Sequence, residues 1–254
     1  MELTEFFNEN PKVAIAFSGG VDSSYLLYAA VSAGAEVIAY YVKSAFQPQF
    51  ELEDAKRLAD CLHAKLRILG IDILKYSDIV KNPSNQCYYC KHEIFTQIRD
   101  AALSDGYTTI LDGTNASDVE GDRPGMKALK ELCVKSPLQE CGLTKDEIRK
   151  RSRNAGLFTW DKPAYACLAT RIKTGEVITA EKLDATEKSE EYLFSLGFRD
   201  FRVRRVGNTA KIQLNESDFE RLLEYRSEIL NELKKYYEAV TLDLEVRNGD
   251  IHAR

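Results

Sequence analysis

The chain has 254 residues, of which 44% are hydrophobic and 30% are charged, with 14 glycines and 6 prolines. This length and composition allow one large or two modest domains with a buried core, and they exclude a disordered or collagen-like protein. The formal net charge of −5, from 35 basic and 40 acidic residues, provides no general attraction to nucleic acid.

The chain lacks the sequence features of membrane and secreted proteins. No stretch approaches the roughly 18 unbroken apolar residues of a membrane span. The N-terminal sequence MELTEFFNENPK carries acidic residues where a signal peptide carries basic ones. We therefore expect a soluble, cytoplasmic protein.

The first two thirds of the chain have the pattern of an α/β domain, because short apolar runs alternate with helical patterns. This pattern predicts a parallel five-stranded sheet with crossover helices. The strands are expected at residues 12–17, 36–42, 65–71, 108–112 and 133–138, and helices at about 22–33, 51–63 and 88–104. Thr144 and Glu147 form a capping box for a further helix that ends at Gly156.

After Cys167 the pattern changes to that of a small α+β domain. A long helix at about 180–196 is followed by the strands FRVRRV and AKIQL, which the turn residues GNT separate. A second long helix is expected from the capping box Ser217 to Glu220, and then a strand at 240–246. We expect a first domain at 1–168 and a second domain at 169–254, which packs on the first domain or mediates oligomerisation with other copies of the chain.

The sequence SGGVDSS, directly after the first strand, predicts a phosphate-binding loop. Its glycines allow a tight turn, its hydroxyls add hydrogen-bond donors, and the following helix N-terminus attracts an anion. An ordinary βα turn with capping residues is the alternative. The loop is neither a Walker A loop nor a GxGxxG loop. It comprises Ser18, Gly19, Gly20, Val21, Asp22, Ser23 and Ser24.

A second polar segment follows the fourth strand at the same edge of the sheet. It begins at Asp112 and contains Asp118, Asp122 and Arg123. The carboxylates suit a hard cation such as Mg²⁺, and the guanidinium suits a phosphate. A capped, glycine-rich turn is the alternative reading.

The six cysteines fall into two groups. Cys87 and Cys90 form a CxxC at the start of a helix, and with Cys167 they make three thiolates, which suits a [4Fe–4S] cluster with one open iron. A redox dithiol, simple packing, or a reactive Cys167 alone are alternatives. The other cysteines are expected to be small core residues, namely Cys61, Cys133 and Cys141.

The loop SGGVDSS resembles the signature of the PP-loop ATP pyrophosphatases. The resemblance implies cleavage of ATP between the α- and β-phosphates, transfer of AMP to a substrate oxygen, and release of pyrophosphate with Mg²⁺. The loop then holds the pyrophosphate, Asp22 and Asp118 assist the metal, and Lys43, Thr114 and Arg123 join the ATP site. The end of the second strand, residues 40–44, is expected near the adenine.

The motifs SGGVDSS, CYYCK, DGTNASD, SPLQECGLTKDEIR, DKPAYACLATRI, FRVRRVG and VTLDLEV together resemble the LarE family of ATP-dependent sulfur transferases over nearly the whole chain. The resemblance implies adenylylation of pyridinium-3,5-biscarboxylic acid mononucleotide and conversion of its carboxylates to thiocarboxylates. The product leads to the nickel-pincer nucleotide of lactate racemase. The sulfur comes either from Cys167, which is sacrificed, or from a [4Fe–4S] cluster; the three cysteines favour the cluster.

The same resemblance implies a site around the reactive cysteine. It contains Arg171 and an acidic residue of the helix expected at about 180–196, either Glu190 or Glu191. Strand alternation puts Arg202 and Arg204 on one face, where they are expected to bind the substrate's phosphate, unless that face is merely solvated. The expected cofactors are ATP, Mg²⁺ and the cluster. The expected partners are the small-molecule substrate, a sulfide or sulfur donor and further copies of the chain, without nucleic acid or membrane.

Two other readings compete with this one. A tRNA thiolase shares the loop and the three cysteines, but the acidic balance and the lack of a basic RNA-binding extension argue against it. A non-enzymatic adenine-nucleotide sensor with a zinc-stabilised fold predicts nucleotide binding without release of pyrophosphate.

Overall fold

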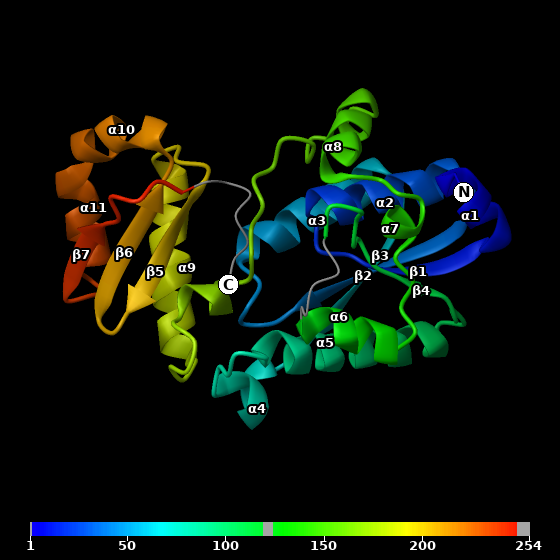
Figure 1. Ribbon diagram of the computed structural model, residues 1–254, viewed down its shortest axis with the longest axis horizontal. Coiled ribbons are helices and arrows are strands. Elements are labelled where there is room, and N and C mark those ends of the chain that lie inside the picture. The colour runs from blue at the N-terminus through cyan, green and yellow to red at the C-terminus, as the bar shows by residue number, and fades with distance from the viewer. Residues whose placement is uncertain (1, 119–123, 248–254) are drawn as a thin grey trace. The chain divides into compact units, whose positions relative to one another are not determined.

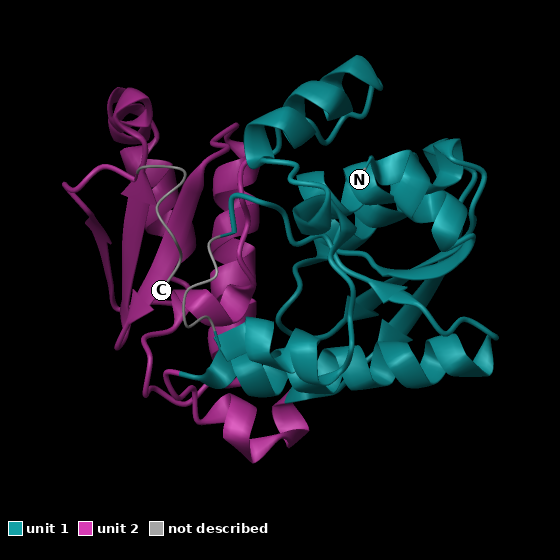
Figure 2. Ribbon diagram, turned by 45° about the vertical axis from the view of Figure 1, so that its right-hand side comes forward, with its two compact units in different colours: residues 1–73, 85–162 teal, residues 74–84, 163–254 magenta. Residues whose placement is uncertain are grey.

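The computed structural model describes residues 2–118 and 124–247, and the chain divides into two compact units (Figure 2). Unit 1 comprises residues 1–73 and 85–162, and unit 2 comprises residues 74–84 and 163–254. Over the described residues, no helix combines the length and the apolar character that crossing a membrane requires.

Unit 1 is built on a parallel sheet with the strand order β3-β2-β1-β4. The strands are β1 (Lys12–Ala16), β2 (Glu36–Lys43), β3 (Lys65–Gly70) and β4 (Ile110–Leu111). In the centre of the sheet, Ala14 of β1 pairs with Ile38 on one side and with Ile110 on the other. The continuous apolar run of β1 is explained by this central position, because both faces of the strand are buried.

Helices cover both faces of this sheet (Figure 1). Val13 and Ile15 of β1 pack into a core with side chains of α1, α2, α3, α7 and α8, whereas Ala14 packs with α5 and α6 on the opposite face. The helices of unit 1 are α1 (Leu3–Glu9), α2 (Val21–Ser32), α3 (Gln49–Cys61), α5 (Gln86–Ser104), α6 (Pro124–Glu131), α7 (Pro137–Glu140) and α8 (Lys145–Asn154). The predicted capping box of α8 is confirmed, since Thr144 accepts a hydrogen bond from the Glu147 amide and Glu147 accepts one from the Thr144 amide.

The prediction of a fifth parallel strand at 133–138 is wrong. The segment contributes only an isolated parallel bridge between Lys135 and Leu111. Cys133 has a φ of 55°, which is left-handed rather than extended, and Pro137 begins α7. Of the three residues between Cys133 and Pro137, Lys135 alone is bridged, and its amide donates to the Ile110 carbonyl at 2.9 Å.

Unit 2 is built on a mixed three-stranded sheet with the order β5-β6-β7. The strands β5 (Phe201–Val206) and β6 (Thr209–Leu214) form an antiparallel hairpin, and β7 (Ala239–Leu242) runs parallel to β6. The helices are α4 (Ser77–Val80), α9 (Ala180–Ser195), α10 (Phe219–Glu224) and α11 (Arg226–Leu233). Single 3₁₀ turns are η1 (Ile73–Lys75), which crosses the boundary between the units in the sequence, η2 (Leu168–Arg171) and η3 (Glu216–Asp218).

Two expectations for the second half of the chain need correction. The long helix expected from Ser217 is broken into η3, α10 and α11, because Ser217 lies inside a 3₁₀ turn and Tyr225, with ψ of 9°, interrupts the helical path. The final strand ends at Leu242 instead of continuing to residue 246.

Residues 74–84 join unit 2 although they lie between segments of unit 1 in the sequence. The Asn82 side chain donates to the Lys173 carbonyl at 2.9 Å, and the Ile178 amide donates to the Val80 carbonyl at 2.8 Å. Asn82 adopts a φ of 53°, a conformation that asparagine tolerates better than most residues. The sequence pattern gave no indication of this attachment.

Candidate functional site

The segment between β1 and α2 forms a tight loop that leads directly into the N-terminus of α2. Gly19 has a φ of 72°, and a Cβ at this position would lie 3.3 Å from the Ala55 Cβ, so glycine is required on both grounds. Gly20 is the N-cap residue of α2 and has no side chain to occupy the first-turn N–H groups. Such a helix N-terminus is suited to bind an anion.

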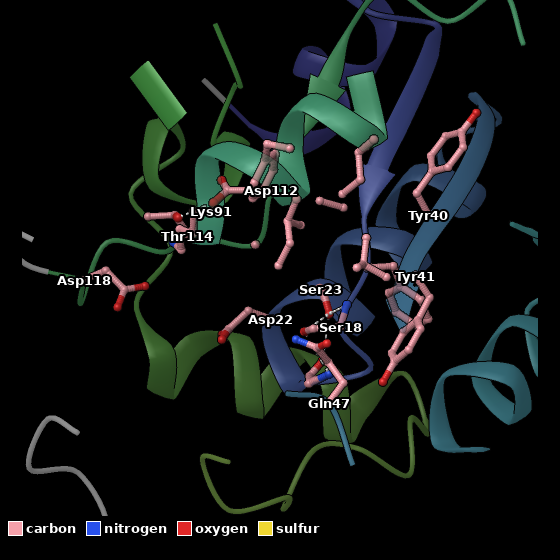
Figure 3. Close-up of a pocket in the computed structure, with 18 residues that line it drawn as sticks. Ser18, Asp22, Ser23, Tyr40, Tyr41, Gln47, Lys91, Asp112, Thr114 and Asp118 are labelled. Carbon is pink, nitrogen blue, oxygen red and sulfur yellow. Dashed lines mark hydrogen bonds between the residues drawn. The ribbon is translucent and has the colours of Figure 1, made fainter. Parts of the chain in front are cut away.

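The serines of the loop form a small hydrogen-bonded cluster (Figure 3). The Ser18 amide donates to the Ser23 hydroxyl at 3.3 Å, and the two hydroxyl oxygens lie 3.1 Å apart. The Ser24 hydroxyl is buried and has no hydrogen-bond partner among the described residues. A buried hydroxyl in this state has an unused donor.

A cavity of about 350 Å³ opens beside this loop (Figure 3). Its lining combines apolar side chains, among them Ile94, Phe95 and Ile98 of α5, with polar ones, among them Asp22 and Asp112. The volume lies in the range of small-molecule sites. Apolar and polar side chains around one cavity, next to a helix N-terminus, are a combination that suits a nucleotide.

Asp22 is the most unusual group of the cavity wall. Its Oδ2 accepts a hydrogen bond from Lys145 Nζ at 2.6 Å, whereas its buried Oδ1 has no hydrogen-bond partner within the described part of the chain. Burial raises the pKa of the Asp22 carboxyl, although the ammonium of Lys145 acts in the opposite direction. An unsatisfied carboxylate oxygen, in a cavity that a second carboxylate, Asp118, also lines, fits a hard cation such as Mg²⁺.

The turn after β4 approaches the loop closely because residue 113 is glycine. A Cβ on Gly113 would lie 3.0 Å from the Ser23 amide nitrogen. The neighbouring Asp112 carboxylate accepts hydrogen bonds from Thr114 at 2.5 Å and from Ser136 at 2.6 Å, which fixes the turn. Thr114 and Asp118 both line the cavity. The expected residues Asp122 and Arg123 lie outside the described residues.

Three polar side chains in or near the cavity and its loop were not predicted from the sequence. Lys91 and Gln47 line the cavity, and Lys162 Nζ lies 3.2 Å from the Gly19 carbonyl and 2.7 Å from Asp54. The expected Lys43 donates to the Gln47 backbone carbonyl. Lys91 directly follows the CxxC, and this position on the same helix was the one signal in the sequence that pointed to it.

The six cysteines are all thiols, and none is in a disulfide. Cys87 is exposed and Cys90 is buried in the first turns of α5, in unit 1, whereas Cys167 belongs to unit 2 and precedes η2. Over the residues the structure describes, no three His, Cys, Asp or Glu side chains form a group that could hold a metal ion.

The interpretation of the remaining cysteines as core residues is wrong for two of them. Cys61 and Cys133 are exposed, since they lie at the end of α3 and in the left-handed turn after α6. Cys141 is half-buried, and burial raises the pKa of its thiol.

In unit 2, a buried ion pair lies close in sequence to Cys167. Arg171 Nε and Nη2 donate to the two carboxylate oxygens of Glu190 at 2.8 Å and 3.2 Å, and both side chains are nearly inaccessible. Burial alone would lower the pKa of Arg171, but Glu190 outweighs it and raises that pKa. Of the two acidic candidates on α9, Glu190 makes this pair, and Glu191 is exposed.

The Glu190 carboxylate has further donors around it. The Tyr165 hydroxyl donates to Oε2, and the Val203 amide of β5 donates to Oε1 at 2.9 Å. Arg171 Nη1 in turn donates to the Ala166 carbonyl at 3.1 Å. The segment that carries Cys167 is therefore fixed to α9 and β5 through one carboxylate.

Arg202 and Arg204 lie on the same side of β5 and have different surroundings. Arg202 is buried, donates to the backbone carbonyls of Phe201 and Ala164, and has a pKa lowered by burial to about 10. Arg204 is partly exposed, donates to the Thr170 carbonyl at 2.9 Å, and also has its pKa lowered by burial. Arg204 is thus the more accessible of the two guanidinium groups.

Known proteins resemble this chain over different lengths. Residues 12–84 match the family described as queuosine biosynthesis protein QueC. The chain is 36% identical over 249 residues to an uncharacterized protein of Synechocystis sp., with 96% of this chain and 92% of the relative covered. It is 32% identical over 236 residues to the pyridinium-3,5-bisthiocarboxylic acid mononucleotide synthase of Lactiplantibacillus plantarum, with 92% and 86% covered. It is 28% identical over 188 residues to the tRNA-specific 2-thiouridylase MnmA of Pseudothermotoga lettingae, with 59% and 54% covered.

We predict that Glu190→Gln destabilises the protein by about 3 kcal/mol, because it leaves Arg171 buried without its counter-charge. Glu191→Gln is the matched control, since it changes the adjacent exposed residue in the same way. Urea unfolding followed by circular dichroism measures both variants. Equal unfolding midpoints for the two would contradict the importance of the pair.

We also predict that Gly113→Ala weakens ATP binding about tenfold, because the new Cβ would push the turn after β4 away from the Ser23 amide. Gly70→Ala is the control, since a Cβ there meets no atom within 4 Å. Titration calorimetry with ATP and Mg²⁺ gives both affinities, and equal dissociation constants would show that the close approach is irrelevant to the cavity.

Proposed function

The chain belongs to the LarE family of ATP-using sulfur transferases of the PP-loop type, and on that premise we propose that it thiolates pyridinium-3,5-biscarboxylic acid mononucleotide in nickel-pincer nucleotide biosynthesis. The observation that carries this proposal is the 32% identity to the bisthiocarboxylic acid mononucleotide synthase over 92% of the chain. A cavity that combines a phosphate-binding loop with an apolar wall supports the ATP-dependent part.

In the first step, a substrate carboxylate oxygen attacks the α-phosphorus of ATP. The bond from that phosphorus to the bridging oxygen breaks, so an acyl adenylate forms and pyrophosphate leaves. The N–H groups of the 18–24 loop bind the pyrophosphate, with Thr114 and Lys43 at the nucleotide and Arg123 as a further phosphate contact. Mg²⁺, held by Asp22 and Asp118, would neutralise charge on the departing phosphates.

In the second step, sulfur replaces AMP at the acyl carbon. A carboxylate oxygen is a poor leaving group, whereas AMP is a good one, so adenylylation makes the substitution feasible. We propose that Cys87, Cys90 and Cys167 hold a [4Fe–4S] cluster, which would supply sulfide. The three thiols at family positions support this source.

The alternative source is Cys167 itself. Its thiolate attacks the acyl carbon and expels AMP, which gives a thioester. Removal of the proton at Cα of Cys167 then breaks the Cβ–S bond, releases the thiocarboxylate and leaves dehydroalanine. The Arg171–Glu190 pair beside this segment orients it, and Arg204 and Arg202 bind the substrate's phosphate.

A tRNA thiolase is the second candidate, and the similarity to MnmA is the observation behind it. That similarity covers 59% of the chain, against 92% for the mononucleotide synthase. The net charge of −5 also gives no general attraction to RNA. We therefore prefer the small-molecule substrate.

We predict that Asp22→Asn and Cys167→Ser separate the two chemical steps. Asp22→Asn should lower pyrophosphate release about a hundredfold, because the metal loses a charged ligand. Cys167→Ser should still release pyrophosphate but form no thiocarboxylate. Pyrophosphate assay and mass spectrometry of the product measure the two steps, with tRNA offered in place of the mononucleotide as the control acceptor. Thiocarboxylate formation by Cys167→Ser would contradict both sulfur sources.

The sulfur source is decided by iron analysis and whole-protein mass after anaerobic purification and turnover. A cluster predicts about four irons per chain, an unchanged protein mass, and loss of iron in Cys87→Ala. Loss of the mass of H₂S from an iron-free protein would instead identify Cys167 as the sacrificed donor.

A further inference from the structure

The ion pair between Lys145 and Asp22 has a feature that helix stability does not explain. Lys145 is the first residue of α8, and a cation at a helix N-terminus is unfavourable because it faces the positive end of the helix dipole. The following first-turn residues, Asp146 and Glu147, have the sign that the dipole favours. The positive charge of Lys145 is thus electrostatically unfavourable at the N-terminus of α8.

The backbone of Lys145 is held firmly. Its amide donates to the Ser117 hydroxyl at 2.9 Å, and the capping box of Thr144 and Glu147 fixes the preceding residue. The side chain is about one quarter exposed, and its Nζ lies 2.6 Å from Asp22 Oδ2. A fixed backbone and a long, partly exposed side chain allow the ammonium to move between two nearby partners.

The charged groups around Asp22 determine how a movement of the Lys145 ammonium would change the charge of the cavity wall. Asp22 and Asp118 are acidic groups of the cavity wall, and Lys145 neutralises one of them. Arg149 also influences Asp22, but two of its guanidinium nitrogens donate to the carbonyls of Trp160 and Lys162 at 2.7 Å and 2.8 Å. Among the described residues, Lys145 is therefore the cation in direct contact with the carboxylate.

We propose that Lys145 is an exchangeable counter-ion, which pairs with Asp22 in the nucleotide-free protein and transfers to a phosphate oxygen when Mg²⁺ arrives with ATP. The inference rests on the proposed assignment of Asp22 to the metal. Before ATP binds, the ammonium repels a divalent cation at the carboxylate that would hold it. The phosphate charge provides the second partner that Lys145 needs in order to leave. Metal binding at this site consequently requires nucleotide.

The test measures Mn²⁺ binding by electron paramagnetic resonance, with and without ATP, in the full-length protein. Wild type should bind Mn²⁺ tightly only in the presence of ATP. Lys145→Met should bind Mn²⁺ without nucleotide at least tenfold more tightly than wild type, and should bind metal-free ATP at least tenfold more weakly. Lys188→Met is the matched control, since Lys188 pairs with Asp184 on the exposed face of α9.

Two further variants keep the result decisive. Lys145→Arg retains the positive charge and should bind Mn²⁺ alone as weakly as wild type. This comparison can be made even if Lys145→Met fails to fold. Adding Asp22→Asn to Lys145→Met should remove the nucleotide-independent binding of Mn²⁺. Unchanged Mn²⁺ affinity in a folded Lys145→Met protein, or tight Mn²⁺ binding by wild type or Lys145→Arg without ATP, would overturn the proposal.

This readout is independent of the sulfur acceptor. A wild-type protein that binds Mn²⁺ only with ATP but thiolates no pyridinium dicarboxylate would refute the proposed function alone. A protein that thiolates this substrate but binds Mn²⁺ without ATP would refute only the role of Lys145.

Discussion

Two carboxylates, the partly exposed Asp22 and the buried Glu190, each form an ion pair with a basic side chain from another element of the structure. Asp22 takes Lys145, from a helix 123 residues later in the sequence, and Glu190 takes Arg171, from the segment that carries Cys167. Each pair joins two elements that are separated along the sequence. Removing Glu190 would leave Arg171 buried without its counter-charge, whereas Asp22 and Lys145 are both partly exposed, so water can solvate either one when its partner is absent.

The two carboxylates differ in how completely their oxygens are satisfied. Glu190 uses both oxygens within the protein, through Arg171, Tyr165 and the Val203 amide. Asp22 uses one oxygen and keeps the other buried without a hydrogen-bond partner among the described residues. The first arrangement is typical of a fixed structural support, and the second is typical of a site that a ligand completes.

Local signals in the sequence were enough for four strands of unit 1 and for the α8 capping box. The fifth strand failed because apolar periodicity does not report the left-handed Cys133 or the helix that starts at Pro137. The sequence could not select Glu190 over Glu191, because only packing against Arg171 distinguishes two adjacent carboxylates. Lys145 and Lys162 were missed for the same reason, since their partners are distant in the sequence.

The attachment of residues 74–84 to unit 2 has a consequence for synthesis on the ribosome. Asn82 is translated early, but the Lys173 carbonyl that its side chain binds lies 91 residues further along the chain. At typical elongation rates this interval is roughly 5 to 20 s. During it, the segment emerges from the ribosome with its polar groups exposed, while the strands before and after it can already pair. Residues 74–84 therefore cannot form this contact with the second unit before Lys173 has been synthesised, and a fragment beginning at residue 163 lacks a part of that unit.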